Sequence, residues 1–339
     1  MKHLLKSILL ILATITNVSG AAFADSLNIY SYRSQLLLQP LLDAYTAETG
    51  TDFNIVHAPK GLVQRLKAEG ANTKADLVMT VDISRIAELA ETGLLAELNS
   101  DVIAANVPHY HRDEKDLWTA LSSRARIVAI AKDRVAQDAI QDIEDLANPE
   151  WKGRICTRKG SHVYNRALLA SIIAHNGAAE AKVWTEALVA NLARKPQGND
   201  RAQAKAIWSG LCDVAIMNTY YYGKMKFNDD EPEQKEWADA IELVFLNQAG
   251  RGQHVNVTGA GILKTSKKQQ AARAFLEWLT EEQAQRIYAS VNYEYPINPS
   301  VAADPEVFSW GQFKVDALPI TEVARLSPKA QMIIDQTGW

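Results

Sequence analysis

Short apolar segments alternate with helical patterns over the first hundred residues, and this alternation limits the fold more than any other feature. Strands are expected at residues 27–30, 53–56 and 76–81. Between them, Pro40 opens a helix that Gly50 ends, and residues 62–69 form a second helix. A third helix, capped by Asp82 and closed by Gly93, follows the last strand. The succession predicts an α/β fold whose sheet is largely parallel, with helices on both faces.

Strand signals return in the second half of the chain, which predicts a second lobe. A chain of 339 residues is also too long for one ordinary core. A return segment after residue 250 indicates that the chain crosses between the lobes more than once. The later strands are expected at residues 118–122, 127–131, 153–156, 213–217, 242–245 and 255–258, with helices from residue 163, over 178–192 and over 200–209.

Residues 1–24 have the pattern of a signal peptide. Lys2 and Lys6 precede a short apolar segment, and Ala22-Phe23-Ala24 matches a signal peptidase site. We expect a mature chain that begins at Asp25, in the periplasm; an uncleaved anchor is the alternative. Loss of the two lysines changes the formal charge from −4 to −6. An acidic surface argues against nucleic acid as a partner.

Cys156 and Cys212 are the only cysteines. In an oxidising compartment they can form a disulfide, and closing a loop of 56 residues would contribute roughly 4 kcal/mol of stability. Two separate buried thiols are the alternative. We expect the disulfide.

A tyrosine run follows the apolar segment 214–217. Residues 218–223 read Asn-Thr-Tyr-Tyr-Tyr-Gly, where Asn218 or Thr219 can cap a helix. The phenols would then lie where a strand ends and a helix begins, which is where ligands bind in open α/β sheets. Aromatic packing in a core is the alternative.

The sequence carries no recognised enzyme signature. It has no G-x-S-x-G, P-loop, H-E-x-x-H or dinucleotide motif. His109-Tyr110-His111 could place two imidazoles together for zinc, but its charged neighbours favour a solvated loop. The tyrosines and arginines are the residues that remain, and no group that could orient a base stands beside the tyrosines, which argues against an enzyme.

Several segments resemble the periplasmic ferric-ion-binding proteins of ABC iron importers. Residues 28–33 (NIYSYR) are one such segment, and the tyrosine motif at 218–225 (NTYYYGKM), together with residues 158–165 (RKGSHVYN), is specific. It extends over nearly the whole mature chain, through residues 60–62, 76–85, 123–126, 191–201, 259–261 and 292–296.

The resemblance implies three tyrosine ligands for Fe³⁺: Tyr164, Tyr220 and Tyr221. Tyr222 is not carried over, and we expect it to pack in the following helix turn. Relatives take a further ligand from the first lobe, either from a His-Tyr pair or from a Thr-Glu-Gln triplet. This chain has Ser34-Gln35 and Thr80-Val81-Asp82 at those places. It therefore resembles the subclass that uses three tyrosines and a bound anion.

Charge counting is consistent with such a site. Ionising a free tyrosine at pH 7 costs roughly 4 kcal/mol, because its pKa is about 10. Three phenolates neutralise Fe³⁺, and a carbonate or bicarbonate in the remaining positions adds negative charge. Arg33 and Arg124, one at each expected lobe edge, could balance the anion. Each could equally be a surface or structural ion pair.

The resemblance also implies the architecture and the partners. We expect a two-lobed type II periplasmic-binding-protein fold, with two hinge strands near residues 124–131 and 244–258. The N-terminal lobe would comprise residues 25–124 plus 254–300, and the C-terminal lobe residues 125–253 plus 301–339. A monomer would capture ferric iron and deliver it to an inner-membrane ABC permease with its ATPase. The alternatives are a binding protein for an organic cation or oxyanion, and an exported enzyme with a tyrosine base or nucleophile.

Overall fold

The computed structural model describes residues 26–339. The expected signal peptide and its cleavage site lie outside the described residues. None of the helices in residues 26–339 combines the length and the hydropathy that a membrane span requires.

Within residues 26–339, nine strands form one mixed sheet in the order β2-β1-β3-β8-β4-β6-β5, with β7 and β9 also paired to β4. Pairing is parallel between β1 and β2, β1 and β3, and β5 and β6, and antiparallel at every contact of β4 and β8. The three strands of the first hundred residues pair in parallel, as expected. The sheet as a whole is mixed, because the two long strands β4 and β8 at its centre pair antiparallel with their neighbours. The strands are β1 (Leu27–Ser31), β2 (Phe53–His57), β3 (Leu77–Met79), β4 (Thr119–Ala131), β5 (Ile155–Cys156), β6 (Val214–Asn218), β7 (Ile241–Val244), β8 (Val255–Ile262) and β9 (Tyr295–Pro296).

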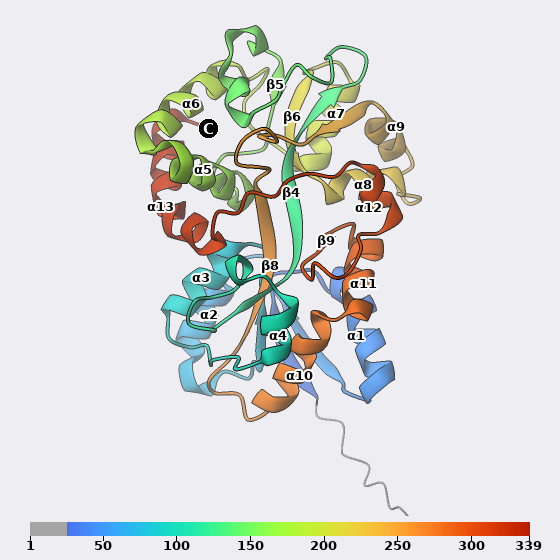
Figure 1. Cartoon of the computed structure of the whole chain (residues 1–339). Helices are drawn as coiled ribbons and strands as arrows, with labels where there is room; N and C mark the ends of the chain where they lie inside the picture. Colours follow the sequence, from blue (N-terminus) through green and yellow to red (C-terminus); the bar gives the residue numbers. More distant parts are fainter. Residues whose placement is uncertain (1–25) are drawn as a thin grey trace, which may run out of the picture.

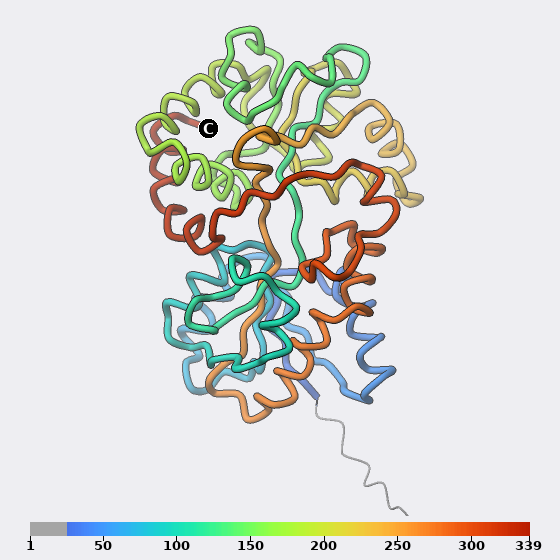
Figure 2. Tube along the Cα trace, in the orientation of Figure 1, coloured from blue at the N-terminus to red at the C-terminus, as the bar shows by residue number. Residues whose placement is uncertain are grey.

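The molecule has two lobes, and β4 runs through both of them (Figure 1). Residues of β4 up to Ala125 pair with β8, and from Arg126 onward they pair with β6. The sequence predicted two strands joined by residues 123–126, but β4 is one continuous buried strand of 13 residues. The polar segment is extended because its serines and arginines make contacts in the junction between the lobes. The trace in Figure 2 shows two main-chain segments crossing side by side between the lobes, those of β4 and β8.

Helices cover the sheet in each lobe. The boundaries of α2 are as predicted, and Asp82 caps α3 by accepting from the Ser84 N–H at 2.9 Å. Helix α1 instead begins at Gln35, and Pro40 lies inside it. The helices are α1 (Gln35–Thr49), α2 (Leu62–Glu69), α3 (Ile83–Glu91), α4 (Asp101–Asn106), α5 (Val163–Asn176), α6 (Ala178–Ala190), α7 (Asp200–Trp208), α8 (Tyr220–Lys226), α9 (Glu233–Asp239), α10 (Gln269–Leu279), α11 (Glu282–Asn292), α12 (Pro305–Ser309) and α13 (Ile320–Thr337).

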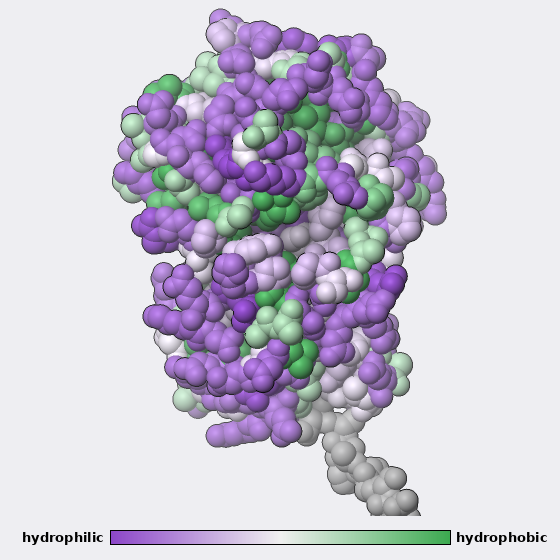
Figure 3. All heavy atoms as spheres, viewed as in Figure 1, coloured by the Kyte–Doolittle hydropathy of each residue, from purple (hydrophilic) through white to green (hydrophobic). Residues whose placement is uncertain are grey.

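The final helix, α13, packs on α3 of one lobe and on α5 and α6 of the other. Within the second lobe, the predicted disulfide between Cys156 and Cys212 is confirmed, with a Cα–Cα distance of 6.0 Å. It ties β5 to the turn that precedes β6, and β6 leads directly into the tyrosine run. Figure 3 shows hydrophilic residues over most of the visible face, with hydrophobic residues near the junction of the lobes.

Candidate metal-binding cleft

A cleft of about 450 Å³ lies between the lobes, and it collects every site residue that the sequence predicted. Arg33 and Arg124 line it together with Tyr164, Tyr220 and Tyr221. These residues come from the turn after β1, from β4, and from the first turns of α5 and α8. Residues separated by nearly 190 positions therefore share one cavity.

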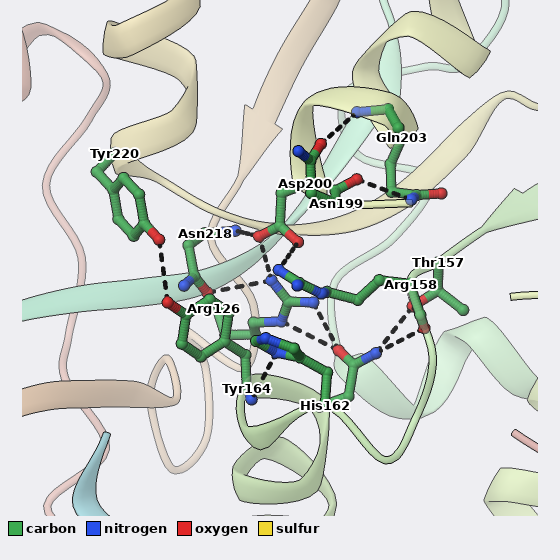
Figure 4. Close-up of polar contacts among 12 residues, drawn as sticks. Arg126, Thr157, Arg158, His162, Tyr164, Asn199, Asp200, Gln203, Asn218 and Tyr220 are labelled. Carbon is green, nitrogen blue, oxygen red and sulfur yellow. Dashed lines mark hydrogen bonds and ion pairs between the residues drawn. The ribbon is translucent and has the colours of Figure 1, made fainter. Parts of the chain in front are cut away.

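The three tyrosines meet at the starts of two helices. The hydroxyls of Tyr164 and Tyr220 lie 3.2 Å apart, facing one another (Figure 4). The rings of Tyr220 and Tyr221 are stacked, with centroids 4.3 Å apart. Three oxygen donors are therefore presented by adjacent turns of α5 and α8.

The start of α8 differs from the expected capped helix. Thr219 already has helical backbone angles, and its side chain makes no capping hydrogen bond. The Asn218 carboxamide accepts from Arg126 Nη1 at 3.1 Å and is not free to cap. The Asn218 oxygen that was expected to cap α8 therefore accepts a hydrogen bond from the buried Arg126 instead.

The environment of Tyr220 and Tyr221 favours their protonated, neutral forms while no cation is bound. Burial, and then the neighbouring Tyr164 and Tyr221, raise the pKa of Tyr220 well above its ordinary value. Burial, and then Asp200, raise the pKa of Tyr221 to about 12. The cleft can therefore hold phenolates only with a bound positive charge.

A buried ion-pair network beneath the tyrosines was missed by the sequence analysis. The Asp200 carboxylate accepts from Arg126 Nη1 at 2.6 Å, from Arg158 Nη1 at 3.1 Å and from the Asn218 N–H at 2.9 Å (Figure 4). The guanidinium carbons of Arg126 and Arg158 lie 5.8 and 5.3 Å from the centre of the Tyr164 ring. The network joins α7, β4 and β6, and so fixes the backbone from which the tyrosines project. The only local signal was that Asp200 and Arg158 lie in segments quoted for the resemblance.

The two predicted arginines converge instead of facing one another from opposite lobe edges. Arg33 Nη1 and Arg124 Nη1 both donate to the Thr258 hydroxyl, at 2.9 and 3.2 Å. Arg33 also forms a buried ion pair with Glu294 at 3.1 Å, and Glu294 accepts from Ser122. Nε and Nη2 of Arg33 and Nε of Arg124 are buried and have no hydrogen-bond partner within residues 26–339. These N–H groups are available to an anion in the cleft.

Tyr222 points away from this cleft, as the sequence analysis expected. Its ring packs edge-on against Trp310 at 5.6 Å and lines a separate pocket. In the first lobe, Asp82 is engaged as the cap of α3 and by the Asn256 amide at 2.9 Å. His109 and His111 lie in a short 3₁₀ turn where His111 is buried, and the described residues contain no group of three His, Cys, Asp or Glu placed for a metal.

Comparison with known proteins places these residues in a family. The family model for the bacterial extracellular solute-binding protein matches residues 32–286. The chain is 38% identical to iron uptake protein A1 of Synechocystis, over 93% of this chain and 88% of that one. It is 26% identical to the major ferric iron-binding protein of Neisseria meningitidis, over 97% of both chains.

Solved structures agree with the sequence comparison. Ferric iron-binding protein A of Mannheimia haemolytica, in an open conformation, is 41% identical with a TM-score of 0.87, over 93% of this chain and 99% of that one. Trichodesmium IdiA (FutA), in complex with iron and citrate, is 37% identical with a TM-score of 0.88, over the same shares. The chain therefore belongs to the bacterial extracellular solute-binding proteins.

Proposed function

We propose that the protein captures ferric iron in the periplasm and delivers it to an ABC permease. The observation that carries the proposal is that three tyrosines, two of them with hydroxyls 3.2 Å apart, line a cleft that two arginines also line. The iron-binding relatives named above support the same cargo. Because those relatives bind solutes, they also support a role without catalysis.

The chemistry of the donors favours Fe³⁺ over other cargo. Fe³⁺ is a hard acid that prefers anionic oxygen, and three phenolates from Tyr164, Tyr220 and Tyr221 would neutralise its charge. A divalent ion would leave one negative charge uncompensated in a partly buried site. An organic cation is disfavoured, because Arg33 and Arg124 line the same cleft.

An oxygen anion such as carbonate would complete the coordination. Three tyrosines leave positions open on an ion that takes about six ligands. The unpartnered N–H groups of Arg33 and Arg124 supply forked donors for such an anion, and Thr258 holds the two guanidiniums together.

Delivery requires that the permease distinguish loaded from empty protein. The lobes are joined through β4 and β8, so bending of these strands would close the cleft over the ion. We propose that the permease, with its ATPase, recognises the closed form.

The visible spectrum of the purified mature protein tests the proposal. Phenolate-to-iron charge transfer absorbs visible light, so addition of ferric citrate should produce a coloured protein that keeps its colour through gel filtration. Iron binding without colour would mean that the tyrosines are not the ligands. Absence of iron binding would refute the function itself.

A further inference from the structure

The cleft carries more positive charge than a ferric ion with carbonate needs. Its lining includes the cations Arg33, Arg85, Arg124, Arg201 and Lys224 and a single carboxylate, Glu294, a net charge of +4. Fe³⁺ bound by three phenolates contributes no net charge. A carbonate dianion would then leave two positive charges in the cleft without compensation.

Of these cations only Arg33 forms an ion pair with a carboxylate in residues 26–339. Arg85 donates to the Pro59 carbonyl and lies over the Tyr32 ring, and Arg124 donates to Thr258. Arg201 and Lys224 are the two remaining cations without a carboxylate partner there. The Arg201 guanidinium lies 5.8 Å from the centre of the Tyr221 ring, and its buried Nε has no hydrogen-bond partner there. Lys224 Nζ donates to the Val291 carbonyl at 3.3 Å.

Lys224 also lies among like charges. Burial, followed by the positive charges of Arg33 and Arg201, lowers the pKa of Lys224 to about 8 against the opposing effect of Glu294. Crowded, half-buried cations cost free energy unless an anion joins them.

The positions of the two residues separate them from the inner arginines. Arg201 lies on α7 and Lys224 on α8, at the side of the tyrosines where the cleft meets a second pocket that both residues line. That pocket also contains Asp230 and Glu231, so an anion would be favoured only on the cleft side. The cleft volume of about 450 Å³ falls within the range of small-molecule sites, roughly 300–1,000 Å³, and exceeds the needs of one metal ion with carbonate.

We propose that Arg201 and Lys224 form a second anion subsite, which binds the outer oxyanion groups of a multidentate chelator that enters with the ferric ion. The inference rests on the proposed function and adds the form of its cargo: a ferric complex of a polycarboxylate or polyphosphate. Forked N–H donors and an ammonium suit either chemistry. The Trichodesmium relative, whose structure holds iron and citrate, supports a polycarboxylate.

The test compares anions on two pairs of variants. Iron is supplied to the mature protein in excess bicarbonate, citrate or pyrophosphate, and apparent affinity is read from the visible band. Arg201→Gln/Lys224→Gln is compared with Lys205→Gln/Lys226→Gln. Lys205 is on the same helix as Arg201 and Lys226 on the same helix as Lys224, but both lie outside the cleft lining. Each comparison is made in one solution, so competition from the free chelator cancels.

Removal of the two cations should weaken binding with a polyanion by about a hundredfold, at about tenfold for each charge-assisted contact. With bicarbonate the loss should stay below about threefold. The citrate and pyrophosphate arms show whether carboxylates or phosphates are preferred.

An equal loss of affinity in the control pair would indicate a general effect of charge and would overturn the subsite. Equal losses with bicarbonate and with the polyanions would overturn it too, although a coloured complex would leave the proposed function standing. A colourless protein in every arm would refute the proposed function.

Discussion

Each proposed ligand, Tyr164, Tyr220 or Tyr221, would bind iron through its hydroxyl oxygen. Removing that oxygen alone tests iron binding without disturbing the packing of the ring. Phe substitution keeps each ring, so the stacking of Tyr220 on Tyr221 survives while a ligand is lost. We expect each single variant to lose at least about a hundredfold in iron affinity, since an anionic ligand to a trivalent ion outweighs an ordinary charge-assisted contact. Competition with a chelator, followed by the visible band, measures the change.

Tyr222→Phe is the matched control. It alters the same helix turn, but its ring packs against Trp310 in another pocket. Its colour and affinity should stay near those of the wild type. Loss of binding in Tyr222→Phe, with Tyr220→Phe or Tyr221→Phe unaffected, would show that the ligands had been assigned in the wrong register.

The choice of substitution at Arg33 depends on its buried ion pair with Glu294. Arg33→Ala would leave Glu294 buried and unpaired, which destabilises a fold by roughly 3–5 kcal/mol. Arg33→Lys keeps the charge but loses the forked geometry. We expect Arg33→Lys to fold, to bind iron more weakly and to respond less to added bicarbonate. A thermal melt checks the folding, and an unchanged bicarbonate response would remove Arg33 from the anion site.

At the scale of the elements, Asp200 holds together the strands and helices that present the tyrosines. It is fully buried between Arg126 and Arg158. Asp200→Asn should lower the free energy of unfolding by roughly 3–5 kcal/mol, because two buried guanidiniums lose their counter-charge. Urea denaturation of the iron-free protein measures the loss.

Asp213 provides the comparison, since it also pairs with two arginines, Arg134 and Arg154. Those arginine side chains are about a third exposed, at 33% and 36%. Asp213→Asn should therefore cost no more than about 1 kcal/mol. If the free energy of unfolding fell equally in the two variants, Asp200 would not be the residue that holds these elements together.

For the whole molecule, three histidines with lowered pKa values predict how stability depends on pH. Burial, and then Arg158, lowers the pKa of His162 to about 3. Burial lowers the pKa of His111 to about 4. Burial, and then Arg126, lowers that of His254 to about 3. An unfolded histidine titrates near 6.5, so between about pH 6.5 and pH 4 only the unfolded chain takes up these protons. The free energy of unfolding should fall by about 1.4 kcal/mol per pH unit for each histidine as the pH decreases.

His111→Gln should remove its share of this slope in urea titrations of the iron-free protein at pH 5 to 7. His57→Gln is the control, because His57 is exposed. A wild-type slope in His111→Gln would mean that His111 is not the source. Carboxylates enter only at lower pH, because their unfolded values lie near 4.

The lobe boundaries remain a proposal at this scale. The exchange of β4 from β8 to β6 occurs between Ala125 and Arg126, one residue beyond the proposed boundary after residue 124. Helix α13, assigned to the C-terminal lobe, packs on α3 as well as on α5. It would have to slide against one of the two as the cleft closes.

Patterns within the sequence determined the local elements and, through the family resemblance, the residues of the cleft. The bounds of α2 and the cap at Asp82 follow from short-range rules of helix termini, which depend only on neighbouring residues. The tyrosine positions followed from the resemblance of two short segments, residues 158–165 and 218–225, each contiguous in the chain. These features could be predicted because the interactions that cause them lie within a few residues.

Tertiary structure alone decided the partners of the charged residues and the direction of the central strands. Arg33 pairs with Glu294 across 261 positions, and Arg126 with Asp200 across 74. No local pattern specifies such a pair, because its geometry depends on the order of strands in the sheet. For the same reason β4 could be mistaken for two strands: its polar middle is buried only because both lobes close around it. The identities of the groups could be predicted from the sequence, and their pairing only from the fold.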